Sequence, residues 1–486
     1  MEKARARDAL AAAFLLLCGA ALAQPQPEAA TGYHAKPAAH ARRFMVAAAN
    51  PLAVEAGVET LRAGGSALDA AIAVQGVLGL VEPQSSGIGG GAFLLHWSQA
   101  EKRVRSYDGR ETAPAAARQD RFLDLSGKPL ALAEAVVNGR SVGVPGVLRM
   151  LELAHRRHGR IAWAKLFRPA IRLAEQGFPM SPRLHRLLAG ESHLRNDSAA
   201  RRLYYGDDDQ PRPIGSRIVN SEYAATLRAI AASGAQAFYT GAIAQDIVNS
   251  VRAHPRPGDL SLEDLARYRA AERDPVCGAY RSRRVCSMGP PGSGAVVLQI
   301  LGLLERAGFH RAAPNSADAV HIYSEAARLA YADRARYLAD PAFVPQPVAG
   351  LLEPAYLDAR ARLVGERSMG QAAPGLPRGA QAQADAAESS IAGTSHVSVV
   401  DARGDAVAMT TTIEQAFGSR IMVRGFLLNN QLTDFAFVPE SGGRAVANRL
   451  EAGKRPRSAM SPTLVLDRDG TLQMTLGSPG GSAIIN

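Results

Sequence analysis

One threonine stands at an abrupt change of pattern in the sequence. Residues 365–393 are rich in Ala, Gly and Gln and show no apolar periodicity. From Thr394 onward, two strand-like runs, "HVSVVD" and "AVAMTTTI", flank the short stretch "ARGD". This arrangement is typical of a hairpin of two strands. We therefore expect residues 365–393 to form an exposed, flexible connector and Thr394 to lie at the start of a sheet.

The position of Thr394 suggests chemistry as well as structure. A threonine hydroxyl becomes an effective nucleophile when a base takes its proton, and the α-amine of the same residue can do so if it is N-terminal. That amine exists only after the bond between Gly393 and Thr394 has been cut. A flexible segment would let the hydroxyl of Thr394 reach the carbonyl of Gly393. The alternative is a threonine favoured at a strand edge by β-propensity alone, and this stretch by itself favours the alternative.

The rest of the chain predicts a protein with both helices and sheets. "SALDAAIAVQGVLGLV" begins with Ser66 and Asp69 at the spacing of a capping box and is apolar enough for a buried helix. The glycine-rich stretch "SSGIGGGAFLLHW" follows it and leads into a strand. Residues 144–360 are mostly helical in pattern, and the clearest helix begins after Ser316.

The first residues have the pattern of a secretory signal peptide. Residues 1–23 combine a basic start, a short apolar core and small residues before the expected cleavage site after Ala23. This apolar run is short for a membrane span, and no later stretch is long and apolar enough to cross a bilayer. We therefore expect an exported, soluble protein in the periplasm or outside the cell.

The formal net charge of +11 raises the question of a nucleic-acid partner. The arginines are dispersed and only 6% of the residues are aromatic, which argues against a nucleic-acid interface. A solvated basic surface that favours anionic substrates is the better interpretation.

Removal of the signal peptide leaves two cysteines, Cys277 and Cys286, in "PVCGAYRSRRVC". They could lie on adjacent strands of a hairpin and form a disulfide in an oxidising compartment, or remain two thiols. No group of His, Cys and Asp residues has the spacing of metal ligands, so we expect no metal site.

Several motifs occur in a characteristic order along the chain. "EPQSSGIGGGAF", "DGRETAP" and "GVPG" come first, and "GTSHVSVVD", "FLLNNQLTDF", "KRPRSAMSPTLVL" and "LGSPGG" follow. From about Ala39 to its last residue, the sequence strongly resembles γ-glutamyltransferases, also called glutathione hydrolases, which are N-terminal-nucleophile hydrolases. The resemblance implies an α/β protein with a four-layer αββα sandwich. It also implies self-cleavage into a large subunit, 24–393, and a small subunit, 394–486, that together form one domain.

The resemblance assigns roles to particular residues. Thr394 matches the nucleophile, and Thr412 matches a second threonine whose hydroxyl supports it. Arg110 matches the arginine that grips the α-carboxylate of the γ-glutamyl group, which suits a planar guanidinium. Ser458 matches the first of two serines at the same carboxylate. The positions around the α-amine of the substrate are matched by Glu414, Gln431 and Asp434.

The reaction implied by the resemblance needs no cofactor. Thr394 attacks the γ-carbonyl of glutathione, and the backbone N–H groups of Gly480 and Gly481 hold the oxyanion. A γ-glutamyl ester forms on Thr394 and passes to water or to an amino acid or peptide acceptor.

The sequence departs from the family pattern in three places. Ala459 replaces the second serine, which removes one hydroxyl from the carboxylate site. The stretch after Asp434 has no obvious tyrosine where some members have a lid, so we expect a more open site. The small subunit ends at Asn486, just past the glycine pair, where family members continue, so we expect it to be truncated at its C-terminus. Two alternatives therefore stay open: a β-lactam acylase that removes a glutaryl group on the same fold, and a truncated, non-catalytic remnant.

Overall fold

The computed structural model describes residues 37–386 and 393–486. The expected signal peptide, 1–23, lies outside the described residues. Within them, no helix combines the length and the hydrophobicity that a membrane span requires.

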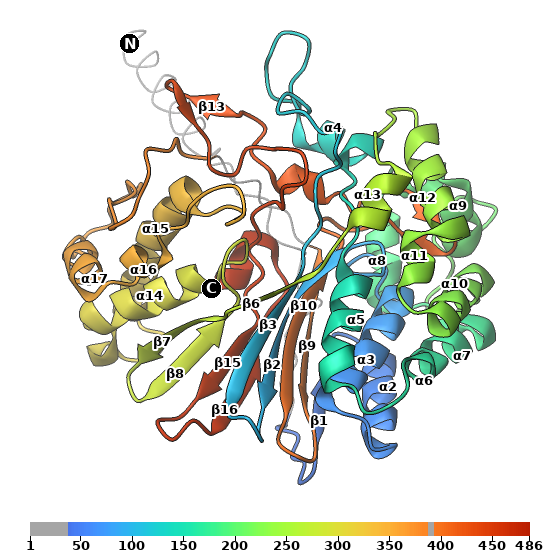
Figure 1. Cartoon of the computed structure of the whole chain (residues 1–486), viewed down its shortest axis with the longest axis horizontal. Coiled ribbons are helices and arrows are strands. Elements are labelled where there is room, and N and C mark those ends of the chain that lie inside the picture. Colours follow the sequence, from blue (N-terminus) through green and yellow to red (C-terminus); the bar gives the residue numbers. More distant parts are fainter. Residues whose placement is uncertain (1–36, 387–392) are drawn as a thin grey trace, which may run out of the picture.

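Two antiparallel sheets lie at the centre of the molecule (Figure 1). The larger sheet has six strands, in the order β1 (Met45–Ala47), β9 (Thr394–Val400), β10 (Ala406–Thr412), β2 (Gly91–Ser98), β3 (Arg103–Gly109) and β6 (Ala271–Arg273). The smaller sheet has four, in the order β16 (Leu472–Leu476), β15 (Thr463–Leu466), β8 (Arg283–Ser287) and β7 (Val276–Tyr280). Short pairs of strands lie outside these sheets: β4 (Phe178–Pro179) with β5 (Arg217–Ile218), β11 (Met422–Val423) with β12 (Phe426–Leu427), and β13 (Glu440–Ser441) with β14 (Arg444–Ala445).

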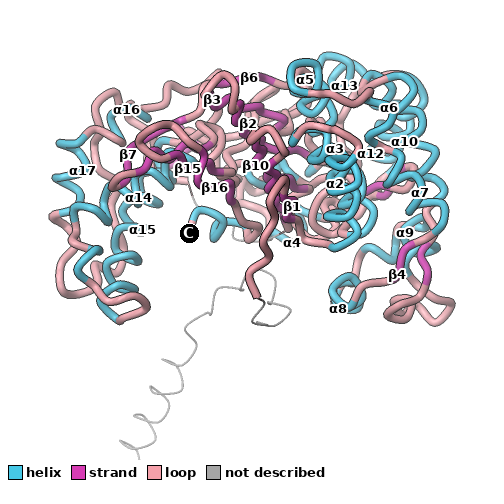
Figure 2. Tube along the Cα trace, turned by 90° about the horizontal axis from the view of Figure 1, so that it is seen from below, coloured by secondary structure: helices cyan, strands magenta, loops and turns pink. Residues whose placement is uncertain are grey.

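Helices cover the outer face of each sheet, as the view in Figure 2 shows. The six-stranded side carries α2 (Pro51–Arg62), α3 (Ala67–Val81), α5 (Val147–His158), α6 (Trp163–Leu166), α7 (Arg168–Gln176), α8 (Pro182–Gly190), α9 (Ser198–Tyr204), α10 (Ser221–Ser233), α11 (Gln236–Tyr239), α12 (Gly241–Ala253) and α13 (Leu262–Arg267). The four-stranded side carries α14 (Gly294–Arg306), α15 (Ala317–Tyr337), α16 (Val348–Leu351) and α17 (Pro354–Ala361). The short helix α4 (Leu132–Val136) lies above the strands in Figure 1. Single helical turns complete the list: η1 (Gly139–Ser141), η2 (Leu194–Asn196), η3 (Phe309–Arg311), η4 (Gln431–Asp434) and η5 (Gly481–Ile485).

Three apolar layers hold these elements together. Leu95 and Ala408 of the larger sheet pack with Leu464 of the smaller sheet and form the layer between the sheets. Side chains that point to the other face of the larger sheet, such as Leu94, pack against α3 and its neighbours. Buried residues of α14, α15 and α17 form a separate cluster on the other side. The predicted αββα sandwich is therefore confirmed.

The local predictions made from sequence patterns also hold. Ser66 caps α3, and its hydroxyl and the Asp69 carboxylate accept each other's backbone N–H groups as a capping box does. Ser316 caps α15. The predicted hairpin is formed by β9 and β10, which pair from Val400 opposite Ala406 to Thr394 opposite Thr412.

Both sheets combine strands from before and after Gly393. In the larger sheet, β9 pairs with β1 and β10 pairs with β2. In the smaller sheet, β15 pairs with β8. A cut at Gly393 would therefore leave two chains that share both sheets and the apolar layer between them.

Residues 365–386 contain no helix and no strand of the two sheets. Several of their backbone groups are nevertheless bound to α15, as described below.

Candidate active site

Two threonines meet where β9 begins and β10 ends. Thr394 and Thr412 are direct cross-strand partners, so their side chains lie on the same face of the sheet. The hydroxyl of Thr394 donates to Oγ1 of Thr412 at 3.2 Å. The hydroxyl of Thr412 donates in turn to the carbonyl oxygen of Gly393 at 2.6 Å, and the N–H of Glu414 donates to Oγ1 of Thr412 at 2.8 Å. The carbonyl before Thr394 is thus already polarised.

Gly393 fits a position with no room for a side chain. A Cβ at this residue would lie 2.6 Å from the carbonyl oxygen of Glu414 and 2.7 Å from the carbonyl carbon of Gln415. The bond between Gly393 and Thr394 can therefore approach the hydroxyl of Thr412 only because residue 393 is glycine.

The histidine two residues after Thr394 is not available as its base. His396 bonds Oγ1 of Thr410 through Nδ1 at 2.9 Å and Oγ of Ser398 through Nε2 at 3.0 Å. Burial lowers the pKa of His396 to about 4, so the ring is neutral at neutral pH. This geometry favours the α-amine of Thr394, once it is free, as the base.

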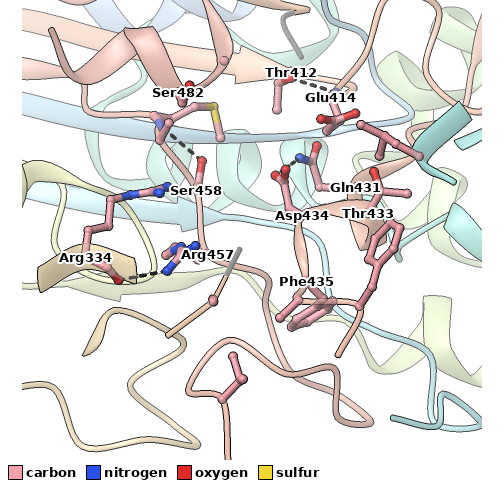
Figure 3. Close-up of a pocket in the computed structure, with 18 of the residues that line it drawn as sticks. Arg334, Thr412, Glu414, Gln431, Thr433, Asp434, Phe435, Arg457, Ser458 and Ser482 are labelled. Atoms are coloured by element: carbon pink, nitrogen blue, oxygen red, sulfur yellow. Dashed lines mark hydrogen bonds between the residues drawn. The ribbon is translucent and has the colours of Figure 1, made fainter. Parts of the chain in front are cut away.

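A cavity of about 530 Å³ opens in front of the two threonines (Figure 3). Thr394 and Thr412 lie in its wall together with Gly481 and Ser482. Gly480 and Gly481 both have positive φ; Gly481 begins the short helical turn η5 and Gly480 is its N-cap. Backbone N–H groups in the first turn of a helix have no partner within the helix, which leaves them able to bind an anion.

Arg110 lies in the cavity wall directly after β3, and its side chain is fully buried. Its Nε donates to the carbonyl of Pro456 at 3.1 Å, and its Nη2 donates to the carbonyl of Arg457 at 2.9 Å. Nη2 also pairs with the carboxylate of Asp434. These bonds fix the guanidinium plane toward the cavity.

Acidic and amide groups gather on the same side of the cavity. Nε2 of Gln431 donates to Oδ2 of Asp434 at 2.7 Å, as Figure 3 shows. The carboxylate of Glu414 accepts from Nδ2 of Asn430. Burial raises the pKa of Glu414 well above its usual range, and the nearby charge of Asp434 adds to this effect. A cation bound here would lower that pKa again.

Ser458 lies across the cavity from Asp434 in Figure 3. Its Oγ accepts from the N–H of Met460 at 3.1 Å, and its backbone is held by the carbonyl of Pro291 and the hydroxyl of Ser293. Ala459 also lines the cavity.

The outer part of the cavity is formed by loops. Leu130, Phe437 and Val438 lie there, and Phe437 stacks on Phe122 with 4.7 Å between the ring centroids. No tyrosine is among the residues described as lining the cavity.

Nine residues singled out from the sequence therefore gather around one cavity or its edge: Thr394, Thr412, Gly480, Gly481, Arg110, Glu414, Gln431, Asp434 and Ser458. Cys277 and Cys286 do not belong to this site. They face each other across β7 and β8 and are joined by a disulfide.

Sequence reasoning missed Asn430, Glu111 and His396. Asn430 orients Glu414, and it stands inside the quoted motif "FLLNNQLTDF". Glu111 is fully buried behind Arg110, with 3.6 Å between its Oε2 and Nη1 of the arginine. Burial raises the pKa of Glu111 to about 8. Its place in "DGRETAP" was visible, but its burial was not.

A threonine at the start of a strand, preceded by glycine in an αββα sandwich, defines the class of N-terminal-nucleophile hydrolases. The profile of the family described as Gamma-glutamyltranspeptidase matches residues 53–486. The chain therefore belongs to the γ-glutamyltranspeptidase family.

Curated relatives agree with this assignment. The chain is 37% identical to a glutathione hydrolase proenzyme of Bacillus subtilis (strain 168), over 91% of this chain and 76% of the relative. It is 36% identical to a glutathione hydrolase proenzyme of Escherichia coli (strain K12), over 99% of this chain and 83% of the relative. It is also 36% identical to an Acylase ACY 1 proenzyme of Pseudomonas sp. (strain V22), over 95% of this chain and 80% of the relative.

Solved structures show the same fold. A cephalosporin acylase from Bacillus halodurans has a TM-score of 0.78 and 26% identity, over 95% of this chain and 82% of that chain. The γ-glutamyltranspeptidase of Helicobacter pylori has a TM-score of 0.67 and 31% identity, over 71% of this chain and 99% of that chain.

Proposed function

We propose that this chain cuts itself between Gly393 and Thr394 and then hydrolyses glutathione or transfers its γ-glutamyl group. The observation that carries the proposal is the hydrogen-bonded arrangement of Thr394, Thr412 and the Gly393 carbonyl. It brings the nucleophile, a donor to the developing oxyanion and the scissile bond together in the uncut chain.

The first reaction is the self-cleavage. Oγ1 of Thr394 attacks the carbonyl carbon of Gly393 and loses its proton, while the hydroxyl of Thr412 stabilises the negative charge on the carbonyl oxygen. The peptide C–N bond breaks and the nitrogen of Thr394 takes up the proton that Oγ1 lost, which leaves an ester between the two residues. Water hydrolyses this ester to a carboxylate on Gly393 and a free hydroxyl and amine on Thr394.

The second reaction is the turnover of substrate. The new amine takes the hydroxyl proton of Thr394 as Oγ1 attacks the γ-carbonyl carbon, and the N–H groups of Gly480 and Gly481 hold the oxyanion. The C–N bond of glutathione breaks, the amine returns its proton to the departing nitrogen, and cysteinylglycine leaves. Water then releases glutamate from the ester on Thr394, or an acceptor amino acid or peptide takes the γ-glutamyl group.

The paired charges of the cavity suit the zwitterionic end of a γ-glutamyl group. Arg110 and Asp434 lie in contact, so a substrate can present its α-carboxylate to the arginine and Ser458 and its ammonium to the aspartate. Glu414 and Gln431 provide further acceptors for the ammonium.

The two products of self-cleavage, 24–393 and 394–486, would stay together as a heterodimer because both central sheets combine strands of both. The signal-peptide pattern of residues 1–23 supports removal of that segment and a location in the periplasm or outside the cell.

An acylase that removes a glutaryl group is the second candidate, since relatives with acylase names share the fold. A glutaryl group lacks the α-amine and therefore gains nothing from Glu414 and Asp434. The test compares γ-glutamyl and glutaryl amides of the same aniline. We expect the γ-glutamyl amide to have a kcat/KM roughly 100-fold higher, and Glu414→Gln to reduce that ratio. Equal rates, or a preference for the glutaryl amide, would favour the acylase.

A further inference from the structure

The connector before Thr394 is bound to one helix, α15. At its first residue, Nε2 of His321 lies 2.7 Å from the carbonyl oxygen of Gly365, and three further attachments follow. At the first of these, the fully buried carboxylate of Glu325 accepts from the N–H of Met369 at 2.8 Å. At the last, the N–H of Ala386 donates to the carbonyl of Ala335 at 3.2 Å. Asp385 forms a two-bonded ion pair with Arg336 there, at 2.7 and 3.1 Å.

The middle attachment is the most elaborate. Asp333 of α15 is fully buried, and its Oδ1 accepts from the N–H of Gly375 at 2.7 Å. The hydroxyl of Tyr337 donates to the carbonyl of Gly375 at 2.6 Å, so both backbone groups of this residue are bound. The guanidinium of Arg360 bonds both Asp333 and the carbonyl of Ala373, at 3.4 and 2.8 Å.

Other side chains complete the coordination of Asp333. Its Oδ2 accepts from Nε2 of Gln299 at 2.5 Å and from the hydroxyl of Tyr356 at 2.8 Å. Gly375 fits against that tyrosine only as glycine, since a Cβ would lie 2.3 Å from the hydroxyl of Tyr356. Burying a carboxylate is strongly unfavourable unless donors are paired with it. The donors around Asp333 therefore make it a specific attachment point for the connector.

These attachments bear on the geometry of self-cleavage. A connector free from residue 365 onward would have to lose the conformational freedom of the whole segment each time the scissile bond reached Thr412. Attachment at Gly375 and Ala386 leaves a much shorter stretch before Gly393. Holding reacting groups in place in this way raises the rate of a reaction within one molecule.

We propose that α15 acts as a positioning surface for self-cleavage, with Asp333 as the positioning residue and Gly375 as the residue that it holds. This inference rests on the self-cleavage proposed above. It assigns Asp333 to the first reaction, because neither Asp333 nor Gly375 lines the cavity of the second reaction. Asp385 and Ala386, at the last attachment, do line that cavity, so both test variants are placed at the middle attachment.

The test follows cleavage of the full-length chain over time in a cell-free synthesis, with products separated by mass, and then measures glutathione turnover per cleaved molecule. Two variants disturb the middle attachment: Asp333→Asn and Gly375→Ala. Two matched controls do not: Gly365→Ala, where a Cβ would have no atom within 4 Å, and Asp69→Asn, which removes a fully buried carboxylate from α3.

We expect both attachment variants to cleave roughly tenfold more slowly or worse, with turnover per cleaved molecule unchanged and with both controls cleaving at the rate of the unaltered chain. The inference is overturned if the attachment variants cleave at the normal rate. It is also overturned if turnover per cleaved molecule falls with the cleavage rate, or if Asp69→Asn slows cleavage equally. Should Asp333→Asn fail to fold, Gly375→Ala decides. An unaltered chain that never cleaves would instead refute the proposed function.

Discussion

The inner and outer parts of the cavity are built differently. The inner wall, formed by Thr394, Thr412, Arg110 and Glu414, comes from strands or from residues directly after them, and each residue is at most 7% exposed. The rim, formed by Leu130, Phe437 and Val438, comes from loops, and Val438 is 41% exposed. Most polar groups of the inner wall are hydrogen-bonded, and Nη1 of Arg110 is a buried donor without a hydrogen-bond partner among the described residues, whereas the rim is apolar and partly solvated. The inner wall is thus suited to recognise one charged group, and the rim to tolerate different amines beyond it.

The largest expected effect is that of Thr394→Ala in the inner wall. Loss of the hydroxyl removes the nucleophile of both reactions, so we expect glutathione hydrolysis to fall on the order of 10⁴-fold or more. Ser395→Ala is the matched control, because Ser395 is the buried neighbour on the same strand and its hydroxyl has no partner among the described residues. If Thr394→Ala hydrolysed glutathione at a rate comparable to that of the unaltered protein, Thr394 would not be the nucleophile.

The next effect is that of Arg110→Gln. A charge-assisted pair with the α-carboxylate would be lost, so we expect the KM for a γ-glutamyl amide to rise roughly 10- to 100-fold. The matched 4-aminobutyryl amide lacks that carboxylate and should be turned over equally poorly by both proteins. An equal loss for both substrates would mean that Arg110 supports only the wall and does not select the carboxylate.

A smaller effect is expected on the pH dependence of stability, from Glu111, which lies behind the inner wall. The pKa of Glu111 is raised from 4.5 to about 8, so the folded protein holds a proton that the unfolded chain releases. Stability from this group is therefore present below pH 4.5 and decreases as the pH rises to about 8. The slope should be at most ~1.4 kcal/mol per pH unit.

We expect Glu111→Gln to flatten that decrease, which chemical denaturation between pH 5 and pH 8 would measure. The difference between the two proteins isolates Glu111 from other groups that titrate. An unchanged slope would show that Glu111 does not cause the loss of stability as the pH rises.

The smallest effect is expected at the rim. Phe437→Ala removes the stacking on Phe122, which should reduce stability by about 0.5–1.5 kcal/mol. The kcat/KM for a small γ-glutamyl amide should change less than about threefold, while the order of preference among bulky acceptors shifts. A large loss of kcat/KM for the small amide would show that the rim, like the inner wall, contributes to recognition of the γ-glutamyl group.

The sequence predicted the local parts of this site better than the distant contacts. The hairpin of β9 and β10 could be predicted from its pattern, and its pairing explains why Thr394 meets Thr412. The contact between Arg110 and Asp434 joins residues 324 positions apart, and no local pattern specifies it; resemblance to the family supplied those two residues.

The connector shows what composition alone predicts and what it does not. Its composition indicates a segment without regular structure, and residues 365–386 contain no helix and no strand of the two sheets. Composition does not reveal that buried carboxylates of α15 bind its backbone, because those carboxylates lie on a helix whose sequence pattern alone does not identify their partners.

The intact mass of the purified, denatured protein tests the central claim most directly. The account predicts two chains that meet between Gly393 and Thr394, and a single chain for Thr394→Ala. A single uncut chain in the unaltered protein would contradict it, because Thr394 would then never gain the amine that activates its hydroxyl.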